Sequence, residues 1–209
     1  MNIAIIDYGM GNLKSVEKAF IALDFNVEIT AKPEAILKAD KVILPGVGAF
    51  RDAIHTLNET GLSEAIHEVV KKGTPFLGIC LGMQLLFDKS YEYGAYEGLG
   101  LLPGKIVQFK TENMLQPNGE RLKVPHMGWN NLDIVKPEPL FQGIADGSSV
   151  YFVHSYYLET TDDVVSGYTT YGGQIAVATQ KDNIFATQFH PEKSGPIGLQ
   201  ILKNFGGMK

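Results

Sequence analysis

The chain has 209 residues and a net charge of −5, with 44% hydrophobic and 20% charged residues. These values are typical of a globular protein, exclude the disordered and fibrous classes, and suit one domain spanning residues 1–209. Only two of its 18 basic residues are arginines, so we expect no nucleic-acid partner. Because it has neither a membrane-length apolar run nor a signal-peptide pattern, we expect a cytoplasmic protein without a membrane partner.

The first 90 residues alternate strand-like apolar runs with amphipathic helical patterns. We expect strands at Ile3–Tyr8, Val27–Thr30, Val42–Leu44 and Phe76–Ile79, and helices at Asn12–Leu23, after Pro33, at Leu62–Lys72 and from Leu81 to Phe87. Strands that alternate with helices form parallel sheets covered on both faces. The pattern therefore predicts an α/β fold with three layers (αβα) around a mostly parallel central sheet.

After about Gly104 the pattern changes to short strand-like runs separated by Gly, Pro, Asn and Asp. The runs are Ile106–Phe109, Leu132–Val135, Val150–Tyr157, Val164–Thr170, Gln174–Thr179 and Ile184–Phe189. We expect them to extend the sheet with antiparallel strands, and we expect a C-terminal helix from Gly198 to Phe205.

The strongest local signal is Gly78-Ile79-Cys80-Leu81-Gly82, at the junction of an expected strand and helix. A sharp turn there lifts a nucleophile clear of the sheet, and the flanking glycines let strand and helix pass closely. The start of a helix also favours a thiolate, and the Leu81 amide can point at a developing oxyanion. Cys80 is the only cysteine, so an internal disulfide is impossible.

A second signal, His190-Pro191-Glu192, closes the apolar run that begins at Ile184. In an extended segment, residues two apart face the same side, so Glu192 can orient the His190 imidazole and support its protonated form. A cysteine nucleophile, a histidine and an orienting carboxylate are the groups used in nucleophilic acyl transfer.

A third signal, Pro45-Gly46-Val47-Gly48, directly follows an expected strand and so lies at the carboxyl edge of the sheet. Its glycines permit unusual backbone angles, so the amide of Val47 or Gly48 can complete an oxyanion hole with that of Leu81.

Cofactor and metal motifs are incomplete in this sequence. Gly9-Met10-Gly11-Asn12 has Lys14 where a dinucleotide fingerprint has its third glycine, and Gly98–Lys105 lacks the spacing of a phosphate-binding loop. The five histidines show no close ligand pair. We therefore expect neither a cofactor nor a metal.

These three motifs in this order resemble the class I glutamine amidotransferases over essentially the whole chain. Two further segments, Asp7–Leu13 and Pro125–Asn130, are similar to the glutaminase subunit of imidazole glycerol phosphate synthase, an enzyme of histidine biosynthesis. The resemblance implies that Cys80 attacks the side-chain amide of L-glutamine, His190 protonates the departing ammonia, and water hydrolyses the glutamyl thioester. It also implies a set of groups that hold glutamine: Gly46, Gln84, Glu92 and the backbone of Ser155 and Tyr156.

The resemblance further implies a heterodimer with a separate (β/α)₈-barrel cyclase subunit. That partner receives the ammonia and makes imidazole glycerol phosphate and an aminoimidazole carboxamide ribotide. The candidate contact residues are Met10, Asn12, Met127, Trp129 and Lys193. Because isolated glutaminases of this family are nearly silent, we predict a poorly formed oxyanion hole in which the Val47 peptide does not donate inward.

Three alternatives remain at this point. The chain can serve a different synthase, such as one for anthranilate or pyridoxal phosphate, although Pro125–Asn130 argues against it. It can be a cysteine peptidase or another thiol hydrolase on a related scaffold, which the position of Gln84 disfavours. It can also be an inactive binding module, which the presence of Cys80, His190 and Glu192 disfavours.

Overall fold

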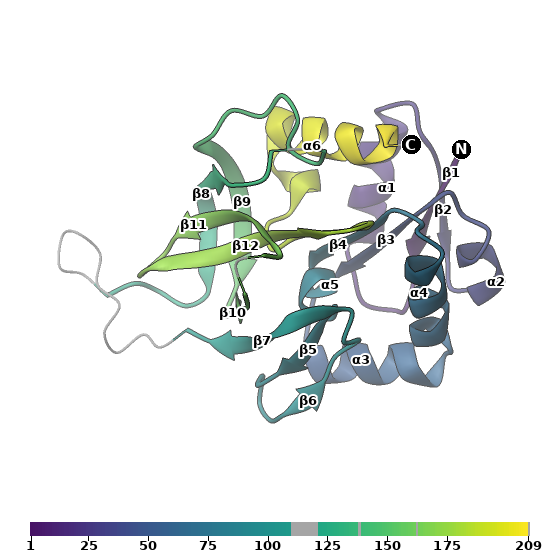
Figure 1. Cartoon of the computed structure of the whole chain (residues 1–209), viewed down its shortest axis with the longest axis horizontal. Coiled ribbons are helices and arrows are strands. Elements are labelled where there is room, and N and C mark those ends of the chain that lie inside the picture. Colours follow the sequence, from purple (N-terminus) through teal and green to yellow (C-terminus); the bar gives the residue numbers. More distant parts are fainter. Residues whose placement is uncertain (110–120, 138, 162, 209) are drawn as a thin grey trace.

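The computed structural model describes residues 1–109, 121–137, 139–161 and 163–208 (Figure 1). One end of its sheet is parallel, in the order β2 (Asn26–Thr30), β1 (Asn2–Ile6), β3 (Lys41–Gly46), β4 (Phe76–Cys80) and β13 (Ile184–Thr187). β3 and β4 are buried at every position, as expected of strands covered on both faces.

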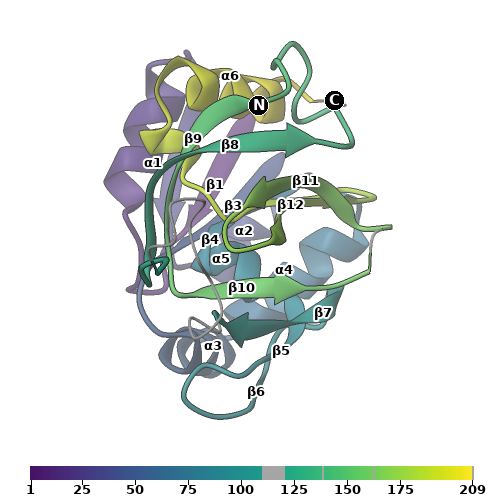
Figure 2. The same cartoon turned by 90° about the vertical axis from the view of Figure 1, so that its left-hand side faces the viewer.

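The sheet continues from β13 through mainly antiparallel strands (Figure 2). Antiparallel pairing joins β12 (Gln174–Lys181), β10 (Tyr156–Glu159) and β7 (Leu102–Gln108), after which β5 (Phe87–Ser90) is parallel to β7 and β6 (Tyr96–Glu97) is antiparallel to β5. A branch from β12 contains β11 (Val165–Thr170), β8 (His126–Ile134) and β9 (Ser148–His154).

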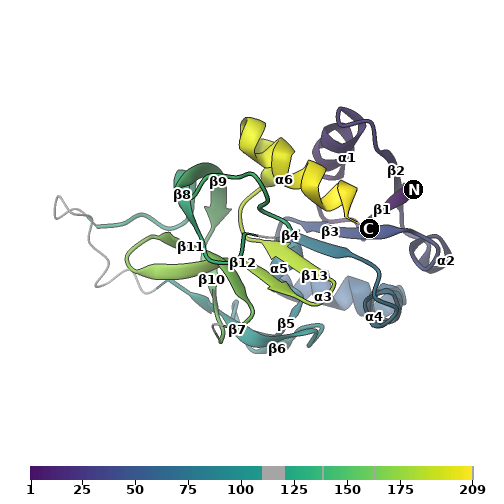
Figure 3. The same cartoon turned by 45° about the horizontal axis from the view of Figure 1, so that its top comes forward.

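Helices cover both faces of the parallel strands (Figure 3). One face carries α1 (Leu13–Ile21) and α6 (Gly195–Gly207), whose Phe20 and Phe205 rings meet edge to face at 6.5 Å. The other face carries α2 (Pro33–Ile36), α3 (Phe50–Glu59) and α4 (Leu62–Lys71), which pack apolar faces onto a second core cluster. The expected three-layer α/β fold with a mostly parallel central sheet and antiparallel additions is confirmed.

Several details differ from the sequence-based expectations. Strands β5 and β6 were not predicted, and β8 begins at His126 rather than at Leu132. Helix α3 was not predicted. The helix expected through Phe87 ends at Gln84 as α5 (Leu81–Gln84), because the carbonyls of Leu85 and Leu86 accept backbone N–H groups from residues 99, 101 and 102 instead of continuing the helix. The run expected as one strand from Val150 to Tyr157 breaks at Ser155, where the chain leaves its pairing with β8 and joins β7 and β12.

The strand order determines where a ligand can bind. β2 and β3 lie on opposite sides of β1, so the winding of the sheet reverses there. In open α/β sheets, ligands bind at the carboxyl ends of the strands beside such a reversal. Tyr8, Gly46, Cys80 and His190 all lie at or just beyond the carboxyl ends of parallel strands. Within the described residues, no helix is both long and apolar enough to cross a bilayer.

Candidate active site

Cys80 occupies a strained turn between β4 and α5. Its backbone has φ +57° and ψ −112°, a left-handed φ that costs a residue other than glycine about 1–3 kcal/mol. The flanking glycines are required by packing, because a Cβ on Gly82 would lie 1.7 Å from the Leu44 carbonyl oxygen and one on Gly78 would lie 2.8 Å from that of Gly82. The predicted sharp turn from strand to helix at Cys80 is present, although α5 has only four residues and offers less positive potential than a full-length helix.

His190 and Glu192 form a buried pair. The imidazole Nδ1 lies 2.8 Å from the Glu192 Oε1, and the two side chains are 2% and 1% exposed. The predicted contact is therefore present, but the extended path proposed for it is wrong. Residues 191–193 form a 3₁₀ turn, η2 (Pro191–Lys193), closed by a bond from the Lys193 amide to the His190 carbonyl.

The environment of His190 favours its protonated form. Burial alone lowers the pKa of His190, but hydrogen bonding and charge from Cys80 and Glu192 outweigh it and raise this pKa to about 10. Nε2, the nitrogen not bonded to Glu192, has no fully formed hydrogen bond to any described residue and is buried. Because Cys80 contributes to the pKa shift and lines the same cavity, this nitrogen is the one available to exchange a proton with the thiol.

A cavity of about 350 Å³ contains most of the residues predicted from sequence. Its lining consists of Val47, Gly48, Cys80, Leu81, Gln84, Glu92, Pro125, Val153, His154, Ser155, Tyr156 and His190. Of the predicted catalytic, oxyanion and glutamine-binding residues, two are outside it: Gly46 and Glu192 line a narrower space that His190 also lines, together with Asn12. The cavity therefore joins the candidate nucleophile, its histidine, the expected oxyanion amides and most of the expected glutamine-binding groups.

A network of side-chain amides lies below the nucleophile. Gln84 Nε2 donates to Gln188 Oε1 at 2.9 Å and to the Tyr156 carbonyl at 3.3 Å, and Gln188 Nε2 lies 3.8 Å from Cys80 Sγ. Since the Gln84 nitrogen is committed to these acceptors, its oxygen remains to accept a hydrogen bond in the cavity. Gln188 was missed in the sequence, yet it lies two residues before His190 in the same run, so period-two alternation identifies it.

Glu92 lies in the cavity and also has a structural role. Its Oε2 accepts the backbone N–H of Phe50 at 2.8 Å, at the first residue of α3. A carboxylate at this end of a helix is stabilising because it accepts an otherwise unpaired N–H. The residue predicted to contact glutamine therefore also caps a helix.

Tyr8 is a second residue that sequence reasoning missed. Its hydroxyl is buried without a hydrogen-bond partner among the described residues, and it would lie 2.3 Å from a Cβ on Gly46. Burial raises the pKa of Tyr8, and the nearby charge of Cys80 raises this pKa further. Gly46 is thus needed to make room for Tyr8.

The expected oxyanion residues surround Cys80. Gly46 is the register partner of Cys80 across β3 and β4, so Val47 and Gly48 follow directly beside the nucleophile. Gly48 has φ +102°, a conformation suited to glycine, and the Val47 side chain is 40% exposed. The inward or outward direction of the Val47 N–H remains a prediction.

The candidate interface residues lie around the catalytic end of the molecule. Met127 and Trp129 are 62% and 58% exposed, whereas monomeric proteins usually bury such side chains. The Trp129 ring lies 4.0 Å from where a Cβ on Gly195 would be. Gly195 is two residues after Lys193, which is exposed. Met10 lies beside Gly48, with its Cε 2.8 Å from where a Cβ on Gly48 would be. Asn12 lines the narrow space that Glu192 also lines.

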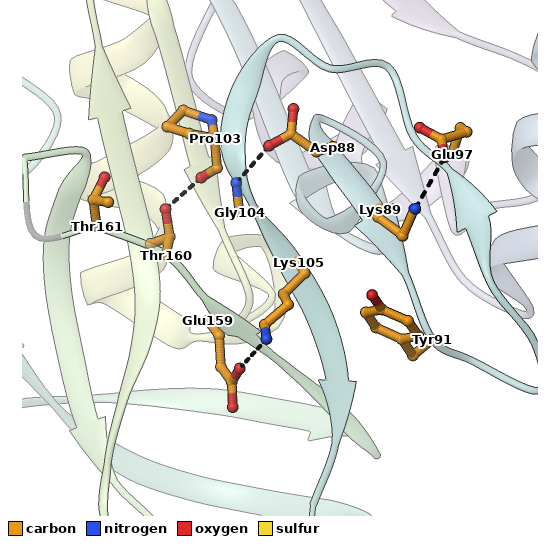
Figure 4. A pocket seen from close by; sticks show the side chains of 10 residues that line it. All are labelled: Asp88, Lys89, Tyr91, Glu97, Pro103, Gly104, Lys105, Glu159, Thr160 and Thr161. Carbon is orange, nitrogen blue, oxygen red and sulfur yellow. Dashed lines mark hydrogen bonds and ion pairs between the residues drawn. The ribbon is translucent and has the colours of Figure 1, made fainter.

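A larger cavity of about 600 Å³ lies between β5, β7 and the end of β10 (Figure 4). Its charged groups are paired: Lys105 with Glu159 at 3.1 Å, Lys89 with Glu97 at 3.2 Å, and Asp88 with the Gly104 amide at 2.9 Å. Its described lining residues include no cysteine, serine or histidine. Across the residues that the structure describes, no group of three or more His, Cys, Asp or Glu side chains could hold a metal ion.

Comparison with known families agrees with this geometry. Residues 4–207 match the family described as "Glutamine amidotransferase class-I", so the class extends over nearly the whole chain. Imidazole glycerol phosphate synthase subunit HisH from Geobacter sulfurreducens is 55% identical over 209 residues, covering 99% of both chains. HisH from Syntrophotalea carbinolica is 53% identical over 207 residues, covering 99% of this chain and all of that protein. The chain therefore belongs to the HisH family of class I glutamine amidotransferases.

Solved structures with low sequence identity share the fold. PurLQS from Thermotoga maritima matches with a TM-score of 0.73 at 17% identity, over 98% of this chain and 96% of that one. The glutaminase domain of CTPS from Trypanosoma brucei matches with a TM-score of 0.64 at 18% identity, over 100% and 95% of the two chains. The predicted resemblance and enzyme class are confirmed, and the HisH relatives agree with the predicted acceptor rather than with anthranilate or pyridoxal phosphate.

Proposed function

We propose that this chain is the glutaminase subunit of an imidazole glycerol phosphate synthase, and that Cys80, His190 and Glu192 are its catalytic residues. The proposal rests on one observation: Cys80, at a strained turn, and the buried His190 line the same cavity, and the Nδ1 of His190 is paired with the Glu192 carboxylate. That arrangement supports acyl transfer, in which a histidine moves a proton while a carboxylate fixes its orientation.

The reaction divides into two acyl transfers. The Cys80 thiolate attacks the side-chain amide carbon of glutamine, and the backbone amides of Leu81 and of Val47 or Gly48 stabilise the oxyanion. His190 protonates the departing nitrogen from Nε2, which releases ammonia and leaves a glutamyl thioester. Water then loses a proton to His190, attacks the thioester and releases glutamate, which restores the thiol.

The substrate's amino acid head group needs acceptors for its ammonium and donors for its carboxylate. The free oxygen of Gln84 and the Glu92 carboxylate supply acceptors, and backbone N–H groups at Ser155 and Tyr156 supply donors. Gly46 acts indirectly, by leaving space for Tyr8 beside the nucleophile.

The ammonia needs a protected route, because free ammonia in water at neutral pH becomes mostly ammonium, which is not a nucleophile. We therefore propose that a (β/α)₈-barrel cyclase subunit docks over Met127 and Trp129, with Met10, Asn12 and Lys193 at the rim, and receives the ammonia directly. The exposed apolar side chains at this end of the molecule support such an interface.

The test measures glutamate release by the purified chain, alone and with the cyclase partner and its ribonucleotide acceptor. We expect low activity alone and strong stimulation by the loaded partner. The Cys80→Ala variant should lose turnover under both conditions while keeping partner affinity. Full activity without a partner would refute the poorly formed oxyanion hole, and turnover by Cys80→Ala would require another nucleophile.

A further inference from the structure

Two buried histidines, His126 and the cavity-lining His154, have no role in the acyl-transfer steps. His126 begins β8, His154 ends β9, and the two are register partners with 3% and 6% exposure. The His126 Nδ1 lies 2.9 Å from the His154 Nε2. The His126 ring is stacked between Phe152 and Tyr171, with ring centres 4.6 and 3.9 Å away.

The hydrogen bonds around these rings can run in only one direction. His154 Nδ1 lies 2.8 Å from the Tyr156 carbonyl oxygen, which can only accept, so this nitrogen carries the proton. In a neutral ring the His154 Nε2 is then an acceptor, and the His126 Nδ1 must be the donor. The His126 Nε2 is left as an acceptor, and the Asn130 Nδ2 lies 3.3 Å from it.

Asn130 is itself fixed in the matching orientation. Its Nδ2 also donates to the Thr170 carbonyl at 3.0 Å, and its Oδ1 accepts the Asn131 amide at 2.8 Å. Burial lowers the pKa of His126 to about 4 and, as the largest of several effects, the pKa of His154 to about 3. Both rings are therefore neutral at physiological pH, as the direction of the bonds requires.

At its other end, this chain of hydrogen bonds reaches the cavity that contains Cys80. The Tyr156 carbonyl that accepts from His154 also accepts from Gln84, which bonds Gln188, whose amide nitrogen lies beside Cys80 Sγ. This carbonyl belongs to the first residue of β10, which follows the break at Ser155 and is in register with Gln108 of β7. The bond from His154 adds to this pairing, because it fixes the carbonyl that also accepts from Gln84.

We propose that Asn130, His126 and His154 form a hydrogen-bond relay with a fixed order of tautomers, which positions the Ser155–Tyr156 backbone and Gln84 for binding glutamine. These are positioning residues, because they act on glutamine through Tyr156 and Gln84. The effect on glutamine binding rests on the proposed glutaminase function, whereas the tautomer order does not.

The tautomers are measured directly by long-range ¹H–¹⁵N NMR of the histidine side chains, with signals assigned by single histidine substitutions. We expect His126 and His154 both to be neutral and to carry their proton on Nδ1, the less common form in a free histidine side chain. Either ring carrying its proton on Nε2 would overturn the relay, whether or not the protein hydrolyses glutamine.

The isosteric Asn130→Asp variant tests the function of the relay, because it places an acceptor where the relay needs a donor. At pH 8.5, where His126 remains neutral, we expect its Nε2 to take the proton. Both tautomers then reverse, and the Tyr156 carbonyl loses its donor. With saturating cyclase partner, we expect the KM for glutamine to rise about tenfold and kcat to change less than threefold.

Asn130→Ala is the matched control, since it also loses the Thr170 bond but leaves water free to donate to His126. We expect its KM to stay within about threefold of the unchanged protein. The relay is refuted if Asn130→Asp keeps both KM and tautomers, or if Asn130→Ala is equally impaired. A wild-type protein with no glutaminase activity beside its partner would instead refute the proposed function, and the NMR result would still decide the relay.

Discussion

At the scale of single residues, the electrostatic setting of His190 has a measurable consequence. Burial lowers its pKa, Cys80 and Glu192 raise it, and the net result is a pKa of about 10. We expect the Glu192→Gln variant to have a lower His190 pKa and slower turnover, because one of the two groups that stabilise the imidazolium is lost. Histidine NMR titration checks the pKa, and a titration unchanged by the substitution would contradict the pairing.

The same shift predicts how stability depends on pH. His190 binds its proton more tightly in the folded chain than in the unfolded chain, whose pKa is about 6.5. Its contribution to the free energy of unfolding is complete below about pH 6.5 and is lost as pH rises toward 10. Denaturant unfolding at several pH values in this range checks this. We expect the free energy of unfolding to fall less with rising pH in Glu192→Gln than in the wild type.

Gln188 offers a second prediction at this scale. Its oxygen accepts from Gln84 and its nitrogen lies beside Cys80 Sγ, so Gln188→Glu keeps the acceptor and loses the donor to sulfur. We expect kcat/KM for glutamine to fall about tenfold and iodoacetamide to alkylate Cys80 more slowly. Gln188→Leu, which loses both bonds, should be impaired further, and normal alkylation in Gln188→Glu would show that the amide does not assist the thiol.

The residues of the site were predictable from sequence to unequal degrees. Cys80, His190 and Glu192 stand in short motifs whose chemistry is local, so the pattern alone indicated them. Gln188 lies two residues before His190, so alternation along that run indicates it, whereas Tyr8 resembles an ordinary member of a buried run. His126 and His154 lie 28 residues apart in sequence and meet only through the register of β8 and β9, so no spacing rule identifies them.

At the scale of secondary-structure elements, apolar runs predicted the parallel strands because both faces are buried. Helix α3 was missed although Phe50, Ala53, Ile54 and Leu57 follow helical spacing, so its signal was present in the sequence. The end of α5 and the break at Ser155 were not predictable locally. Both are determined by backbone hydrogen bonds to distant segments.

The nucleophile turn depends on close contact between two elements. A Cβ on Gly82 would lie 1.7 Å from the Leu44 carbonyl oxygen, a clash with backbone that no side-chain rotation relieves. We expect Gly82→Ala to reduce the free energy of unfolding by about 3 kcal/mol or more. Gly207→Ala is the control, because a Cβ there has nothing within 4 Å and its φ is not positive. Denaturant unfolding measures the stability of both variants. Equal stability would show that Gly82 and Leu44 are not in close contact.

At the scale of the whole molecule, the fold places the candidate catalytic residues and the candidate docking surface at one end. Strands β4 and β13 are adjacent and parallel, so Cys80 and His190 reach the same carboxyl edge of the sheet. Strand β8 brings exposed Met127 and Trp129 to the same region, while its His126 points inward to the relay. One strand thus carries both the proposed partner contact and the support of the glutamine cavity.

This arrangement predicts which surface side chains the partner requires. Trp129 is 58% exposed and contacts Tyr151 edge to face at 6.0 Å, so its removal should cost little stability. We expect Trp129→Ala to weaken cyclase binding by about tenfold or more, because large aromatic residues dominate interface energies. Ile21→Ala is the control, since Ile21 is 56% exposed but ends α1 at the opposite edge of the sheet. Titration calorimetry measures both, and equal affinities for the two variants would place the partner on another surface.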